Sequence, residues 1–175
     1  MTKIKKLVYA ALCIALGVVL PIAFHSIPNA GSIFLPMHIP VLLCGLICGW
    51  EYGLICGAVT PILSSLITGM PPMAYVPSMT IELAVYGYVA GLLINIIKTK
   101  NTSVNIYISL ILAMFAGRLA GGIVKAFIFS SGSYSMQIWI TSSFITALPG
   151  IIIQLILIPI LVIALKKAKL VEQLG

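Results

Sequence analysis

The 175-residue chain is poor in charge, above all in negative charge. It has no Asp and only three Glu, and charged residues of both signs make up 7% of the chain against 61% hydrophobic residues. A soluble protein of this length needs a polar surface, because a small globule keeps much of its surface in water. So few charges cannot supply that surface. We therefore expect lipid to be the solvent of this chain.

The missing aspartates and motifs also exclude several classes of membrane enzyme. Intramembrane aspartyl proteases and lipoprotein signal peptidases need paired Asp, and lipid-alcohol phosphotransferases hold metal with Asp clusters. A rhomboid-type protease would need Gly-x-Ser-x-Gly, which is absent, and a histidine within a span, whereas we expect both histidines to lie outside the spans. No Gly-x-x-x-x-Gly-Lys-Ser/Thr phosphate loop is present either. We predict no enzyme activity and no cofactor.

The four cysteines give no disulfide pattern and no strong metal signal. Cys13, Cys44, Cys48 and Cys56 all lie within apolar runs. The spacing of Cys44 and Cys48 would place both on one helical face, so a metal pair is conceivable. Packing as small residues in a membrane core is the better explanation, and we predict no metal site.

Long apolar segments dominate the rest of the chain. A helix needs about 20 apolar residues to cross the hydrocarbon, and six segments reach or approach that length. They predict an all-α, six-helix transmembrane bundle forming a single integral membrane domain over residues 1–175. The approximate helix limits are 7–24, 39–49, 52–68, 79–97, 106–129 and 140–165. The second is short, so we expect it to begin inside the preceding loop or to be buried by its neighbours.

The positive charges predict the orientation. Eight of the ten Lys and Arg lie in the N-terminus, the 98–100 turn and the C-terminal tail, which six spans place on one side. Loops 25–38, 69–78 and 130–139 contain no charged residue. The positive-inside rule therefore predicts cytoplasmic termini in a cell membrane, and charges in this arrangement do not predict a nucleic-acid partner. The long outer loops suit lids over a site open to the outside, or they simply cap the bundle.

Three charged residues within the spans are candidates for function, because charge in the membrane is costly. Arg118 and Lys125 are seven residues apart and share a face of the fifth segment, with the glycines 121–122 between them leaving room for a ligand. Glu82 is expected near the depth of Lys125, with Tyr86 one turn deeper on the same face.

Two interpretations of this cluster stay open. It could line an outward-facing pocket for a small polar or anionic molecule, or it could be a structural ion pair of Glu82 with Lys125 or Arg118. A single pair leaves one positive charge uncompensated, which favours an anionic ligand group. Further candidates for the wall are Thr141, Ser142, Ser143, Thr146, His38 and His25.

The sequence resembles a known family on several short motifs. Ala11 and Ala15 form an Ala-x-x-x-Ala in the first helix, just after the lysines of residues 3–6. Leu-Pro-Met-His-Ile-Pro at 35–40, Thr-Pro at 60–61 and Gly-Met-Pro-Pro at 69–72 also match. With the length, six helices and long first outer loop, the chain resembles the substrate-binding S component of energy-coupling factor (ECF) vitamin transporters of prokaryotes.

That resemblance implies a function. An S component binds a vitamin or related micronutrient with high affinity near the outer surface, in a pocket closed by outer loops (here 25–38 and 69–78) and lined by helices four to six. Separate subunits, a transmembrane coupling subunit and two ATPases, power import. The Ala11 and Ala15 pair would dock on the coupling subunit. The candidate substrate-binding residues are then Glu82, Tyr86, Arg118, Lys125, Thr146 and His38.

Other functions remain possible from the sequence. The chain could be a structural or regulatory membrane protein without a small-molecule ligand, its charges serving as internal ion pairs. It could also be a stand-alone transporter acting as an oligomer. Ligand binding separates the first alternative from the vitamin-binding subunit, and dependence on partner ATPases separates the second.

Overall fold

The computed structural model describes residues 1–24, 29–128 and 135–171. These ranges contain helices and no strand. Six helical stretches within them are long and apolar enough to cross a membrane, which confirms the predicted six-span, all-α architecture.

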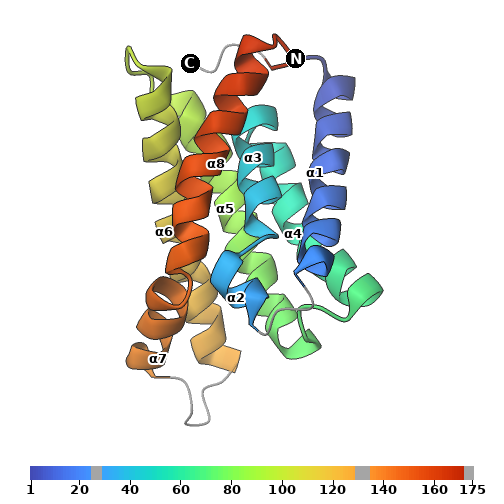
Figure 1. Ribbon diagram of the computed structural model, residues 1–175, viewed down its shortest axis with the longest axis vertical. Coiled ribbons are helices and arrows are strands. Elements are labelled where there is room, and N and C mark those ends of the chain that lie inside the picture. The colour runs from blue at the N-terminus through green and yellow to red at the C-terminus, as the bar shows by residue number, and fades with distance from the viewer. Residues whose placement is uncertain (25–28, 129–134, 172–175) are drawn as a thin grey trace.

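The main helices run up and down, so α1 begins and α8 ends at the same end of the bundle (Figure 1). They are α1 (Lys3–Ala23), α3 (His38–Cys48), α4 (Trp50–Thr68), α5 (Val76–Ile96), α6 (Thr102–Ile128) and α8 (Leu148–Lys167). Four short elements lie at the opposite end: α2 (Ala30–Phe34), the 3-10 helix η1 (Met73–Tyr75), α7 (Met136–Ile140) and the π-helical turn η2 (Thr141–Ile145).

The second span starts within the segment predicted as the loop 25–38. Helices α2 and α3 together form an apolar stretch over Ala30–Cys48, interrupted where Leu35 adopts a left-handed conformation (φ 51°) just before Pro36. His38 is the first residue of α3 and is buried. The expectation that both histidines lie outside the spans is therefore wrong for His38, because the span begins earlier than hydropathy alone indicates. His25 lies outside the described residues.

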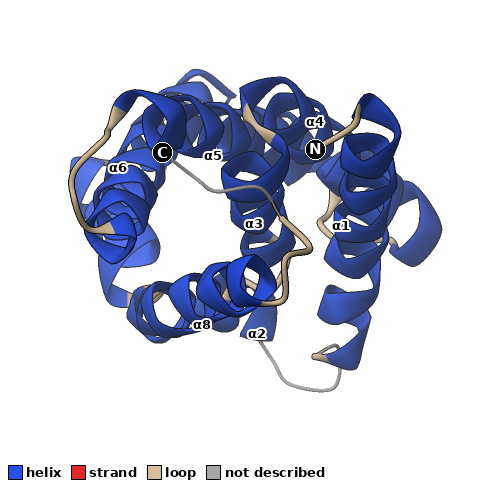
Figure 2. Cartoon of the chain, turned by 90° about the horizontal axis from the view of Figure 1, so that it is seen from above, coloured by secondary structure: helices blue, strands red, loops and turns tan. Residues whose placement is uncertain are grey.

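Helix α3 forms the centre of the bundle, between α1, α4, α5 and α8 (Figure 2). Nearly all of its residues are buried, including Val41, Leu42 and Leu46. A helix that is apolar on all sides is suited to such a position. The four cysteines are also buried and form no disulfide.

Small residues let α3, α4 and α5 approach closely. A Cβ atom added at Gly87 of α5 would overlap the backbone of Gly53 in α4, and one added at Gly45 of α3 would overlap the Gly87 carbonyl. Gly57 is closed in the same way by the Leu83 carbonyl. Backbone-to-backbone packing of this kind is how small residues associate membrane helices. It gives α5, which carries Glu82, a fixed position.

The sixth span differs from the predicted continuous helix over 140–165. The chain forms α7, then the turn η2, and only then α8, which has a proline in its first turn. Proline suits the first turn of a helix because no partner for its missing N–H is needed there. In η2 the Thr146 amide donates to the Thr141 carbonyl at 2.8 Å, the i to i+5 pattern of a π-helix. The polar segment thus forms a separate corner.

Candidate functional site

A cavity of about 840 Å³ lies at the end of the bundle opposite to the start of α1 and the end of α8. Its wall comes from the end of α1, the α2–α3 segment, the loop before α5, the first half of α5, the second half of α6 and the α7–η2 corner. The positions of these segments can be followed in Figure 1. The residues that line it are Pro21, Phe24, Asn29, Ala30, Gly31, Ser32, Ile33, Leu35, Pro36, Met37, His38, Met70, Pro71, Pro72, Tyr75, Met79, Glu82, Arg118, Lys125, Ile138, Ser142, Ser143 and Thr146.

The loop between α4 and η1 is held to α4 by hydroxyl groups. Ser64 donates to the Met70 carbonyl at 2.7 Å, and Ser65 donates to the Pro71 carbonyl at 2.8 Å. Two prolines in succession offer no backbone N–H, so the carbonyls are the groups through which this loop can be held. The loop is therefore an ordered part of the cavity wall.

The carboxylate of Glu82 is the centre of the charged cluster. Its Oε1 lies 3.6 Å from Arg118 Nη1 and 3.7 Å from His38 Nε2, and its Oε2 lies 3.4 Å from Lys125 Nζ. Tyr86 donates a long hydrogen bond of 3.5 Å to Oε1. The side chains of Glu82 and Arg118 are only 4% and 6% exposed. In so dry a position a charge is retained only when it is paired or serves a ligand.

The cluster carries more positive charge and more donors than one carboxylate uses. Arg118 and Lys125 against Glu82 give a formal surplus of +1 when His38 is neutral. Arg118 Nε and Nη2 and His38 Nδ1 are buried without a hydrogen-bond partner in the described part of the chain. A buried donor left unmatched costs about 1–3 kcal/mol. Arg118 and His38 line the cavity through other atoms, so an anionic group there would lie close to these buried donors.

The structure places five of the six predicted substrate-binding residues on the cavity wall: Glu82, Arg118, Lys125, His38 and Thr146. The sixth does not reach it. Tyr86 is fully buried, with its ring edge-on to His38 (centroids 5.3 Å apart, planes at 63°). It fills the space that Gly117 leaves on α6. Tyr86 therefore contacts Glu82 and His38 within the protein and does not face the cavity.

The space beside the glycines 121–122 is filled by the protein itself. A Cβ atom at Gly121 would lie 2.7 Å from Glu82 Oε2, and one at Gly122 would overlap the indole of Trp139. The Trp139 Nε1–H donates to the Arg118 carbonyl at 3.4 Å. The expectation that these glycines leave room for a ligand is wrong, because the side chains of Glu82 and Trp139 occupy the space beside them.

The polar corner at η2 contributes three of its four predicted residues. Ser142, Ser143 and Thr146 line the cavity, whereas Thr141 does not. Sequence reasoning missed the share of α1 in the wall, namely Pro21 and Phe24. The Phe24 ring stacks obliquely on Phe34 of α2 (centroids 5.4 Å apart), closing that side. Apolar residues at a helix end carry no sequence signal that separates them from the rest of the span.

Ala11 and Ala15 of α1 do not line this cavity. Both are exposed on the face of α1 that is turned away from the bundle, whereas Ala10, Cys13 and Gly17 on the other face are buried. The exposed face also carries Ile4, Val8, Leu12, Leu16 and Val19. This small-residue pair is therefore accessible to lipid or to another membrane helix.

No group of three or more potential metal ligands occurs among the described residues.

A family profile matches most of the chain. The profile of the family described as "ECF transporter, substrate-specific component" matches residues 5–162. No curated protein matches the chain.

Proposed function

The chain belongs to the family of ECF transporter substrate-specific components, and from this premise we propose that it captures a vitamin or related micronutrient that carries an anionic group. Membership makes it a substrate-binding subunit that associates with coupling and ATPase subunits. Its six apolar helices make it a multi-pass membrane protein. The identity of the substrate is the part that the site geometry addresses.

The observation that carries the proposal is the state of Arg118. One terminal nitrogen lies 3.6 Å from Glu82 Oε1, while Nε and Nη2 have no partner in the described part of the chain and the residue lines the cavity. Nε and one terminal nitrogen of a guanidinium form the fork that binds a carboxylate through two parallel hydrogen bonds. Glu82 contacts the other terminal nitrogen, Nη1, and so orients the guanidinium while the fork stays unpaired among the described residues. Both fork nitrogens are buried beside the cavity, so a carboxylate of the substrate would complete the fork once the side chain turns toward it, with Lys125 nearby.

The rest of the cavity suits a molecule with an apolar or hydroxylated body. Its volume of about 840 Å³ falls within the range of small-molecule sites, about 300–1,000 Å³. Met37, Met79 and Ile138 supply apolar contacts, and Ser142 and Thr146 supply hydroxyls. Pantothenate and nicotinate have this combination of a carboxylate and a small body. Neutral pyridoxine or a cationic thiamin precursor would leave the surplus positive charge without a partner.

We also propose that the termini lie in the cytoplasm and that the cavity opens to the outside. The supporting observation is the lysine distribution, because residues 3–6, 98–100 and 166–169 all lie at the end away from the cavity. A C-terminal fusion to green fluorescent protein should then fluoresce, and a C-terminal alkaline phosphatase fusion should be inactive. The reverse pattern would contradict this orientation.

Delivery of the substrate would depend on the face of α1 that is turned away from the bundle. Ala11 and Ala15 are accessible there, and paired small residues four apart allow two membrane helices to approach closely. This face is where we propose that the transmembrane coupling subunit docks, with two ATPases driving import.

A thermal-shift titration of the detergent-purified protein tests the substrate proposal. Vitamins that carry a carboxylate should raise the melting temperature in a saturable manner, because a ligand that binds only the folded state stabilises it. Their amides or alcohols should have little effect. Stabilisation by a neutral or cationic vitamin alone would refute the anionic substrate. No response to any vitamin would favour the alternative in which the cluster is purely structural.

A further inference from the structure

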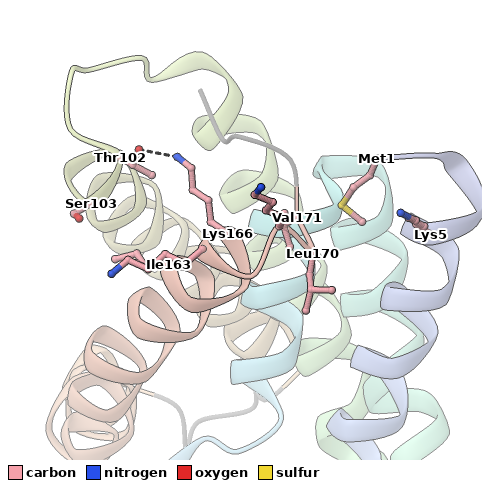
Figure 3. Close-up of a pocket in the computed structure, with 10 residues that line it drawn as sticks. Met1, Lys5, Thr102, Ser103, Ile163, Lys166, Leu170 and Val171 are labelled. Carbon is pink, nitrogen blue, oxygen red and sulfur yellow. Dashed lines mark hydrogen bonds between the residues drawn. The ribbon is translucent and has the colours of Figure 1, made fainter.

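A second cavity, of about 700 Å³, lies at the end of the bundle where α1 begins and α8 ends (Figure 3). It is separate from the substrate cavity, and the two share no lining residue. Its wall comes from three parts of the chain, namely the N-terminus with the first turn of α1, the first turn of α6, and the last turns of α8 with the segment that follows. The proposed function makes no use of it.

The cavity is strongly cationic. Lys5 of α1, Lys166 and Lys167 of α8, and Lys169 just beyond α8 line it, and none of the ten lining residues is acidic. Four positive charges around one cavity repel one another unless an anion is present, so the arrangement is suited to a multiply coordinated anionic group. Lys169 has a left-handed backbone (φ 57°), which turns the chain back after α8.

Two hydroxyl groups also line the cavity. Thr102 and Ser103 line the cavity from the start of α6, and Lys166 Nζ donates to Thr102 Oγ1 at 2.9 Å (Figure 3). This bond links α8 to α6. Ammonium and hydroxyl donors together are the groups that coordinate the oxygens of a phosphate.

The cavity also has apolar lining residues. Ile163, Leu170 and Val171 line it, and Leu170 is 49% exposed. The cavity sits where α8, an otherwise apolar span, ends in lysines, which is the level at which a membrane helix meets the lipid headgroups. A free phosphate ion would use only the polar lining residues. A phospholipid would use both, with its phosphate among the lysines and its acyl chains along the apolar surface.

We propose that this cavity binds the headgroup of an anionic phospholipid, such as phosphatidylglycerol. Basic pockets between transmembrane helices at the cytoplasmic side are the kind of site that anionic headgroups occupy. A lipid bound here would hold the start of α1, the start of α6 and the end of α8 together.

Native mass spectrometry with equimolar phosphatidylglycerol and phosphatidylcholine tests the proposal. The wild type should retain phosphatidylglycerol over phosphatidylcholine, and this preference should fall about fivefold or more in K166Q/K169Q. The matched control K98Q/K100Q removes two exposed lysines that do not line the cavity, and it should keep the preference. Because Lys166 also bonds Thr102, K167Q/K169Q serves as a second variant that leaves that bond intact.

Three results would overturn the proposal. An equal loss of preference in K98Q/K100Q would mean general surface electrostatics. An unchanged preference in both cavity variants would place the lipid elsewhere. Displacement of phosphatidylglycerol by millimolar inorganic phosphate, with equal stabilisation of the fold, would identify a free phosphate site. All three results are independent of the substrate cavity, so they leave the proposed function untouched.

Discussion

Replacing Arg118 by Gln should weaken the binding of a carboxylate-bearing substrate by about 10- to 150-fold. The substitution lowers the formal charge of the cluster from +1 to zero, because only Lys125 then opposes Glu82. It also removes the guanidinium fork whose Nε and Nη2 have no partner in the described part of the chain. Hydrogen bonds to charged groups contribute about 1.5–3 kcal/mol, and each 1.4 kcal/mol is a factor of ten in Kd.

The assay is isothermal titration calorimetry on detergent-purified protein, with the carboxylate vitamin identified by thermal shift and with its uncharged amide. Arg118→Gln should weaken the carboxylate and leave the affinity for the amide nearly unchanged. Arg118→Lys should fall between Gln and wild type, since it keeps the charge but not the fork. Lys98→Gln, which removes an exposed positive charge at the other end of the bundle, should have no effect.

Equal losses for the carboxylate and the amide would refute the reasoning, because Arg118 would then support the fold of the cavity rather than bind the anion. An unchanged Kd for both would remove Arg118 from the site altogether. The melting temperature of each variant separates these cases from simple unfolding. Glu82 keeps Lys125, His38 and Tyr86 as partners in the Gln variant, so we expect the protein to fold.

Three further predictions concern other parts of the molecule. Replacing Ala11 and Ala15 together by Leu should abolish uptake in proteoliposomes that contain the coupling and ATPase subunits yet spare substrate binding; lost binding would show that the pair supports the fold. Gly87→Ala should lower the free energy of unfolding by about 1–3 kcal/mol, because the new Cβ overlaps the Gly53 backbone. The control Gly31→Ala meets no atom within 4 Å and should be neutral in denaturant titrations. Tyr86→Phe should cost about 0.5–1.5 kcal/mol of stability and leave Kd within about threefold; a larger loss of affinity would place the hydroxyl in the site.

Most of the architecture could be predicted from the sequence because a bilayer imposes simple rules. Apolar length alone predicted six spans, and the cost of charge in lipid singled out Glu82, Arg118 and Lys125 as a cluster. In the structure Arg118 and Lys125 both contact the carboxylate of Glu82. Both cations contact the same Glu82, so the ion pair of the first interpretation is present, and ligand binding by the cluster stays a proposal that the Arg118→Gln titration tests.

The rest depends on tertiary contacts that hydropathy does not register. The short helix α2 lies within the predicted loop 25–38, and the π-helical turn over Thr141–Ile145 interrupts a predicted continuous helix. The glycines 121–122 suggest open space, yet Glu82 and Trp139 occupy it. Which neighbour fills a gap is decided by how α5, α6 and the α7 corner pack, and a single sequence holds no direct record of that packing.

The most direct test of the central claim is mass spectrometry of the small molecules released from protein purified in detergent, with wild type and Arg118→Gln prepared side by side. We predict a vitamin or related micronutrient with a carboxylate or other anionic group, present in near-stoichiometric amount in the wild type and strongly depleted in the variant. A neutral or cationic compound retained equally by both, or no bound molecule in a protein that also ignores added vitamins, would contradict an anion-binding site at Arg118.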